Sequence, residues 1–324
     1  MYEDGIVIVE YRDVAQNLPL VVGSRGSPLA LAQTDEVCKN LMLASSQLAA
    51  KGAIRRKIIK TSGDKFLSDA LSEVGGKGLF TKEIEDELLS NTIDIAVHSM
   101  KDVPTKLPDG LMIGCILPRE DPRDAFISLT YNSINELPLG SRVGTASLRR
   151  KAQLLHLRPD LDIGVLRGNV ETRLQKITDG IFDATLLAVS GLNRLGKAHH
   201  ITRLLSPEEM LPAVAQGAIG IECRKTDNFT LNLLSSFDDI KSRYCISAER
   251  TFLEELDGSC QTPIGALAEM MDADHIRFRG LIVSNDGKKI YDIERHGLAV
   301  DGQSIGLSAG KELRTLGGIN FFGK

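Results

Sequence analysis

The chain has 324 residues, with 39 Lys and Arg against 43 Asp and Glu and a formal net charge of -4. At roughly 150 residues per domain this length predicts two domains or three small ones, and the 42% hydrophobic and 25% charged content is typical of a globular protein. The acidic excess argues against nucleic acids and membranes as partners, because both select a basic face, and no stretch of the chain has the roughly 18 apolar residues that span a bilayer.

Residues 1–19 are expected to form an N-terminal extension. Their only apolar run is Ile6–Val9 and they are rich in acidic residues, so they lack the basic start and long apolar core of a secretory signal. The five cysteines are scattered and contain no C-x-x-C pair: Cys38, Cys115, Cys223, Cys245 and Cys260. We therefore expect a reducing cytoplasmic compartment, no disulfide framework and no metal site.

Apolar runs and helical periodicities alternate through the first two thirds of the chain. Strands are expected at 20–22, 54–60, 93–97, 111–117, 125–129, around 143, 163–166 and 184–189, and helices at 28–42, 80–88, 147–157 and 170–177. Ser27 is a suitable N-cap, and Pro28 suits the first helical position. The alternation predicts an α/β protein with mostly parallel sheets covered by helices on both faces.

The last third has a different pattern. Helices are expected at 231–237, 246–256 and 305–316, and strands at 264–270, 276–283 and 289–295, with Asn285-Asp286-Gly287 as the hairpin turn between the last two strands. This order predicts a small antiparallel α+β domain after the α/β part.

Arginines stand at several predicted helix starts. Arg25 precedes one helix, Arg149 and Arg150 open a second after Ser147, and Arg167 precedes a third in which Arg173 lies one turn inside. The helix dipole would place acids there, so arginines indicate an anionic ligand held by guanidinium groups and backbone N–H groups. These turns gather at the carboxyl ends of the strands, which predicts a small molecule bearing several carboxylates or phosphates.

Three further segments are candidates for chemistry. Residues 97–104 (VHSMKDVP) follow a buried strand, and Asp102 beside Lys101 could serve as proton acceptor, donor or counter-ion; alternatively this is a simple turn with a core histidine. Residues 61–78 are glycine-rich and could form a lid or an ordinary loop, but they lack P-loop spacing. Cys260 lies in a turn and could be a nucleophile, an attachment point or an inert thiol.

Taken together, these segments closely resemble the porphobilinogen deaminase (hydroxymethylbilane synthase) family from about Leu20 to the end of the chain. The resemblance is carried by residues 23–30 (GSRGSPLA), 75–80, 96–104, 118–125 (PREDPRDA), 144–150, 166–170, 216–222 and 258–263. It implies two lobes like those of periplasmic binding proteins plus a small C-terminal α+β domain. The expected boundaries are 20–117 with 217–235 for lobe 1, 118–216 for lobe 2, and 236–324 for a cofactor-anchoring domain.

The resemblance also implies an activity. Members of the family are transferases of haem and tetrapyrrole biosynthesis that condense four porphobilinogen molecules into hydroxymethylbilane and release ammonia at each addition. Their primer is a covalent dipyrromethane cofactor, here expected as a thioether on Cys260, and the enzyme is expected to be a cytoplasmic monomer. By resemblance Asp102 is the catalytic carboxylate. The cofactor would be bound by Lys101, Asp102, Thr145, Ser147, Arg149, Arg150 and Cys260, and the substrate by Arg25, Ser27, Arg167, Arg173 and Arg194.

Two residues depart from the common family pattern. Glu73 stands where many relatives have lysine, and Ser259 stands where glycine is common before the cysteine. We expect neither to abolish activity. Two alternatives stay open from the residues alone: a non-catalytic two-lobed receptor for a polycarboxylate, and a transferase with a transient cysteine adduct.

Overall fold

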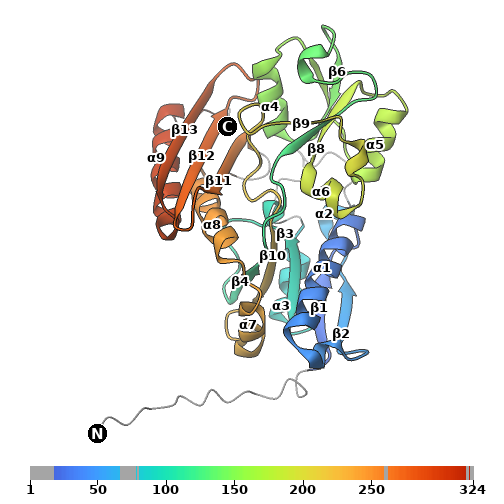
Figure 1. Cartoon of the computed structure of the whole chain (residues 1–324), viewed down its shortest axis with the longest axis vertical. Coiled ribbons are helices and arrows are strands. Elements are labelled where there is room, and N and C mark those ends of the chain that lie inside the picture. Colours follow the sequence, from blue (N-terminus) through green and yellow to red (C-terminus); the bar gives the residue numbers. More distant parts are fainter. Residues whose placement is uncertain (1–17, 66–77, 79, 259–261, 319–320, 322–324) are drawn as a thin grey trace.

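A computed structural model describes residues 18–65, 78, 80–258, 262–318 and 321, which form three sheets covered by helices (Figure 1). In Figure 1 the lobe built on the first sheet lies below the lobe built on the second, and the C-terminal domain lies to their left. Within the described ranges no helix combines the length and the apolar character needed to cross a membrane.

The first sheet has the strand order β2-β1-β3-β10-β4. Its strands are β1 (Leu20–Ser24), β2 (Ile54–Ile58), β3 (Ile95–Ser99), β4 (Leu111–Ile116) and β10 (Ile219–Arg224). β1 pairs in parallel with β2 and β3, but β10 runs antiparallel to both of its neighbours. The prediction of mostly parallel sheets is therefore wrong here, because a strand that the sequence pattern did not reveal returns from far along the chain.

Helices cover both faces of this sheet. They are α1 (Pro28–Ala44), α3 (Lys82–Leu89) and α7 (Asn228–Ser235), with the short α2 (Ser62–Lys65) and 3-10 turns at Ser46–Ala49 and Met100–Asp102. As predicted, Ser27 caps α1: its side chain accepts a hydrogen bond from the Ala30 backbone N–H. This cap fixes the start of α1 directly beyond the carboxyl end of β1.

The second sheet has the order β7-β6-β8-β5-β9. Its strands are β5 (Asp124–Ile127), β6 (Arg142–Gly144), β7 (Asp162–Gly164), β8 (Ala184–Ala188) and β9 (Arg203–Leu204), and its helices are α4 (Leu148–Leu157), α5 (Val170–Thr178) and α6 (Val189–Arg194), with 3-10 turns at Ile134–Glu136 and Ala198–His200. β6 is parallel to β7 and β8, whereas β5 is antiparallel to β8 and β9. The two lobes thus share one mixed pattern, and their chain passes between them twice, once between β4 and β5 and once between β9 and β10.

The C-terminal domain is antiparallel, as predicted. It comprises β11 (Ile264–Met270), β12 (His275–Val283), β13 (Ile290–Leu298), α8 (Ile240–Glu255), a 3-10 turn at Ala299–Asp301 and α9 (Gly302–Gly317). Phe252 of α8 meets Phe278 of β12 edge to face, with ring centroids 5.2 Å apart. A Cβ at Gly306 would lie 2.1 Å from the Ala248 carbonyl oxygen, so this glycine lets α9 press against α8. The α/β lobes and this α+β unit confirm the predicted fold class.

The C-terminal domain packs against the segment that follows β3. Met100 and Val103, on either side of Lys101 and Asp102, share one buried apolar cluster with Phe252 and with Ile264 of β11. Arg250 of α8 also donates hydrogen bonds to the backbone carbonyls of residues 103–105. The turn that carries Lys101 and Asp102 is therefore held from the C-terminal domain as well as from its own sheet.

Candidate active site

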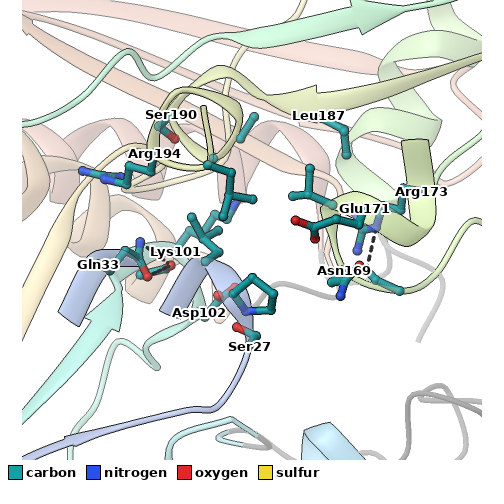
Figure 2. A pocket seen from close by; sticks show the side chains of 18 of the residues that line it. Ser27, Gln33, Lys101, Asp102, Asn169, Glu171, Arg173, Leu187, Ser190 and Arg194 are labelled. Carbon is teal, nitrogen blue, oxygen red and sulfur yellow. Dashed lines mark hydrogen bonds between the residues drawn. The ribbon is translucent and has the colours of Figure 1, made fainter. Parts of the chain in front are cut away.

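A cleft of about 910 Å³ lies between the two lobes, where the turn after β3 faces the starts of α1 and α5 and the helix α6 (Figure 2). Its lining is strongly basic. The basic residues are Arg25, Lys101, Arg150, Arg167, Arg173, Lys176 and Arg194, against two acidic residues, Asp102 and Glu171. Figure 2 shows Asp102 and Ser27 on one side of the cleft and Asn169, Glu171 and Arg173 on the other.

The lobe 1 wall begins at the turn between β1 and α1. The Ser27 hydroxyl oxygen, which caps α1, lines the cleft beside Arg25. The Arg25 guanidinium carbon lies 4.2 Å from the centroid of the Phe80 ring, a distance suited to a cation–π contact. The predicted Arg25 and Ser27 therefore both face the cleft from one short turn.

The 3-10 turn after β3 brings Lys101 and Asp102 to the cleft. Met100 is buried and anchors the turn, while Ser99 exchanges hydrogen bonds with Gln33 of α1 at 2.8 and 3.0 Å. Burial lowers the pKa of the Lys101 ammonium group to about 8, although the neighbouring Asp102 carboxylate opposes this shift. The turn thus presents a carboxylate and a desolvated amine side by side.

His98, one residue before this turn's cap, belongs to the core. It is 5% exposed, and its Nε2 lies 2.9 Å from an Oε2 of the buried Glu222 on β10. It does not line the cleft. The structure therefore confirms the reading of His98 as a satisfied core histidine.

The start of α4 carries the arginine pair, and a buried aspartate holds both members. Asp124 of β5 is 0% exposed; its carboxylate lies 2.8 Å from Arg149 Nη2 and 2.7 Å from Arg150 Nη2. Burial alone would raise the pKa of the Asp124 carboxyl, but the two guanidinium groups hold it far below its usual value. Arg150 reaches the cleft, whereas Arg149 is turned away and donates to the Leu211 carbonyl oxygen.

Gln216 connects this cluster to lobe 1. Its amide nitrogen donates to Asp124 Oδ1 at 2.8 Å, and its amide oxygen accepts from Lys101 Nζ at 3.4 Å. Gln216 is 1% exposed and lies in the segment that returns from lobe 2 to lobe 1. A continuous polar chain therefore runs from Lys101 through Gln216 and Asp124 to Arg150.

The lobe 2 wall comes from α5 and α6. Asn169 caps α5 by accepting a hydrogen bond from the Thr172 backbone N–H, as the expected helix start requires. Burial, helped by the charge of the nearby Arg150, lowers the pKa of Arg173 to about 10. Arg194 ends α6 and pairs with Glu36 of α1 at 3.1 Å, so it bridges the lobes at the rim.

The structure gathers most of the predicted site residues. Those that line the cleft are Arg25, Ser27, Lys101, Asp102, Arg150, Arg167, Arg173 and Arg194. The others that are described do not line it: Arg149 is bound to Asp124, the Ser147 hydroxyl caps α4, and the Thr145 hydroxyl accepts from the Ser147 backbone N–H. Three residues singled out from the sequence lie outside the described residues: Glu73, Ser259 and Cys260. The same holds for residues 1–17 of the expected N-terminal extension and for residues 66–77 of the expected lid.

The sequence reasoning missed several cleft residues. Gln33 and Phe80 line the cleft from lobe 1, and Glu171 and Ser190 line it from lobe 2. A signal existed for Gln33, since it is a polar residue two turns into a helix whose first turn faces the ligand. Glu171 stands in a helix first turn, where an acidic residue is ordinary and therefore attracts no attention.

The described side chains fit a ligand with several carboxylates. Arg150 lines the cleft and its buried Nε has no hydrogen-bond partner among the described residues, and Lys101, also in the lining, is desolvated. Buried cations require counter-charge; Asp124 supplies one negative charge to the arginine pair, and the seven basic residues of the lining face only two carboxylates. The cleft thus has the volume, the charge and the free donors for a compact polyanion.

Comparison with known proteins agrees with this chemistry. Residues 20–232 match the family model described as "Porphobilinogen deaminase, dipyromethane cofactor binding domain", and residues 243–315 match "Porphobilinogen deaminase, C-terminal domain". The chloroplastic porphobilinogen deaminase of Oryza sativa subsp. japonica is 52% identical over 306 residues, covering 93% of this chain and 85% of the relative. The porphobilinogen deaminase of Paracoccus denitrificans is 52% identical over 304 residues, covering 94% and 96%.

Solved structures with a similar chain path include ligand-binding proteins. A putative methionine-binding lipoprotein from Bacillus subtilis is 15% identical, covers 68% of this chain and 90% of its own, and has a TM-score of 0.41. A nutrient binding protein from Burkholderia cenocepacia, bound to methionine, is 14% identical, covers 67% and 90%, and has the same TM-score of 0.41.

Proposed function

This chain belongs to the porphobilinogen deaminase family, and from that premise we propose the task of each residue in the cleft. The reaction joins four porphobilinogen molecules head to tail into hydroxymethylbilane and releases one ammonia for each. This reaction belongs to tetrapyrrole biosynthesis. Membership of the family therefore rules out the alternative of a non-catalytic polycarboxylate receptor. The observation that carries the assignment of residues is the position of Asp102 beside Lys101 in a cleft lined by seven basic side chains.

The dipyrromethane cofactor, when bound, supplies the terminal pyrrole carbon to which each new unit is joined. Lys101 and Arg150 would hold its carboxylates, since both line the cleft and both carry buried nitrogen atoms. Arg150 would be held in position by Thr145, Ser147 and Arg149, on its side away from the cleft. We propose Cys260 as the attachment point. The described residues on either side of it support this role, because Leu256 and Ile264 pack in the same cluster as Met100 and Val103.

The remaining cations suit the substrate, whose pyrrole ring bears an acetate and a propionate. Arg25 and Ser27 line the cleft from lobe 1, and Arg167, Arg173 and Arg194 line it from lobe 2. Figure 2 shows Ser27 and Arg173 on opposite sides of the cleft. Guanidinium groups grip carboxylates in a fixed bidentate geometry, so binding across the cleft orients the ring as well as retaining it. Effective orientation of two reactants removes much of the entropic barrier to joining them.

Asp102 stabilises the positive charge that develops during the reaction and accepts the proton that is released. Cleavage of the carbon–nitrogen bond releases ammonia and leaves a cationic pyrrole from the substrate, which an adjacent carboxylate stabilises. When the new carbon–carbon bond has formed, one ring proton must leave, and Asp102 accepts it as a general base. The ion-rich, partly buried setting makes both effects stronger than they would be in water.

We propose the domain boundaries 20–117 with 217–235, 118–216 and 236–324. Strand β10 and helix α7 support the split first lobe, since β10 completes the first sheet and α7 packs on it through Leu231 and Leu234. A reducing cytoplasm is proposed as well, supported by four buried free cysteines, Cys38, Cys115, Cys223 and Cys245. The monomer is proposed from the family resemblance. The plant relatives are named chloroplastic.

Turnover of purified protein tests the function. With porphobilinogen, wild type should produce hydroxymethylbilane and four ammonia per product. Asp102→Asn should keep its cofactor but lose about 10²–10⁴-fold in turnover, the usual contribution of a general acid or base. The matched control is Asp109→Asn, an exposed aspartate in the same β3–β4 connection, which should turn over normally. Near-normal rates in Asp102→Asn would show that another group moves the proton.

A further inference from the structure

Glu171 is the second carboxylate of the cleft, and the proposed mechanism leaves it without a task. It projects from the first turn of α5 into the cleft, opposite Asp102 (Figure 2). A site built to hold acetate and propionate groups gains nothing from a second negative charge, because like charges repel. The first turn of α5 favours an acid in any case, but Glu171 also lines the cleft, where its carboxylate suits a positive group on the ligand.

The hydrogen bonding of Glu171 is incomplete. Its Oε2 is buried and has no hydrogen-bond partner among the described residues, and its Oε1 lies 3.8 Å from Lys197 Nζ, too far for a hydrogen bond. A buried carboxylate oxygen without a donor is costly. The Glu171 side chain as a whole is 41% exposed and lines the cleft, so it can turn this carboxylate toward a donor that the ligand brings.

Porphobilinogen carries one such donor. Its aminomethyl group is an ammonium with three N–H donors, and it is the only cation on a molecule that otherwise bears two carboxylates. We propose that Glu171 is a substrate-binding residue that accepts a hydrogen bond from this ammonium group. The inference rests on the proposed function and adds the recognition of the leaving group to it.

The position of Glu171 allows it to share the ammonium with the reaction centre. Arg173, two residues further along α5, lines the same cleft and lies close enough to Asp102 for their charges to interact. Glu171 and Asp102 line the same cleft from opposite sides (Figure 2). An ammonium with three N–H donors can bind Glu171 while its carbon lies near Asp102.

Loss of the Glu171 charge should weaken the binding of porphobilinogen but strengthen the binding of an analogue that lacks the amine. In Glu171→Gln, the KM for porphobilinogen should rise about tenfold, the lower end of what one charge-assisted hydrogen bond contributes, with kcat within about threefold of wild type. An analogue in which methyl replaces the aminomethyl group has only its carboxylates. It should inhibit Glu171→Gln more strongly than wild type, and calorimetry should show the same tighter binding.

Two variants serve as controls. Asp179→Asn removes an exposed carboxylate from the other end of α5, away from the cleft, and should leave both constants unchanged. Lys197→Met removes the nearby lysine; if Glu171 merely paired with Lys197 to brace α5, this variant would raise the KM as Glu171→Gln does. Unchanged KM in Lys197→Met supports the binding role.

The inference is overturned if the binding of both probes responds to Glu171→Gln in the same way. If porphobilinogen and its methyl analogue both bind Glu171→Gln more tightly, Glu171 only repels carboxylates; if neither changes, it does not meet the ligand. Both outcomes leave the proposed function intact, because wild type still makes hydroxymethylbilane. Failure of wild type to convert porphobilinogen would instead remove the proposed function and this inference with it.

Discussion

Asp124 lies at the centre of the polar chain between the lobes, and its charge should contribute strongly to stability. It is 0% exposed, and the arginine side chains that it holds at 2.7 and 2.8 Å are 6% and 4% exposed. Asp124→Asn keeps the shape but leaves two buried guanidinium groups without their counter-charge. Breaking a buried ion pair from one side typically costs about 3–5 kcal/mol, so the free energy of unfolding should fall by about that amount.

Urea denaturation of cofactor-free protein measures this loss. A suitable control is Asp121→Asn, three residues earlier, which removes an ion pair with Arg123 whose side chains are 21% and 37% exposed; exposed pairs contribute at most about 1 kcal/mol. Comparable losses in the two variants would refute the reasoning, since burial would then make no difference.

The pH dependence gives a second check on Asp124. Its folded-state pKa is depressed by Arg149 and Arg150, so the stability that it contributes is fully present above the unfolded-state pKa of about 3.9 and is lost as the pH falls below it. The difference between wild type and Asp124→Asn should therefore be constant from neutral pH to about pH 5 and should shrink in stronger acid. A difference that does not change with acid would mean that charge is not what Asp124 supplies.

Two further predictions concern Lys101 and Gly217. Because burial lowers the pKa of Lys101 to about 8, the amine loses its charge above that pH, and cofactor assembly on adduct-free protein supplied with porphobilinogen should slow between about pH 7 and 9. Lys101→Arg should lose this pH dependence, because arginine stays charged. An identical pH profile in the variant would contradict a role of Lys101 in binding the cofactor. Gly217 has φ +93 where the crossing segments meet, and a Cβ there would lie 2.3 Å from the Glu120 carbonyl oxygen. Gly217→Ala should lower the free energy of unfolding by about 1–3 kcal/mol more than the control Gly140→Ala, because of overpacking. Gly140 has a similar φ of +74 but nothing within 4 Å of an added Cβ. Equal melting curves for the two variants would argue against the contact at Gly217.

Local signals explain what could be predicted. The caps Ser27, Ser147 and Asn169 each accept a backbone hydrogen bond at the start of the helix that the sequence predicted there, because capping depends on residues three positions apart. The hairpin at Asn285-Asp286-Gly287 follows the same logic, with Gly287 at φ 75. Most cleft residues were predictable for this reason, since they stand at helix starts or directly after a strand.

Long-range pairing explains what could not be predicted. Strand β10 pairs with β3 and β4, more than 100 residues earlier, and nothing in its own residues sets its direction or its place in the sheet. The arginine pair is another case. Arg149 and Arg150 are adjacent, so their side chains leave α4 about 100° apart. Their partners Asp124, Leu186 and Leu211 all lie far from them in the sequence, so the sequence alone does not show which arginine reaches the cleft.

Growth of a pyrrole chain on Cys260, with Asp102 moving its protons, is tested most directly by the mass of the protein after a limited pulse of porphobilinogen. Wild type from cells that make porphobilinogen should carry two pyrrole units on the peptide containing Cys260 and gain further units one at a time. Asp102→Asn should keep the two units and gain no more. Hydroxymethylbilane production by a protein without this adduct, or with the adduct on another residue, would contradict the mechanism.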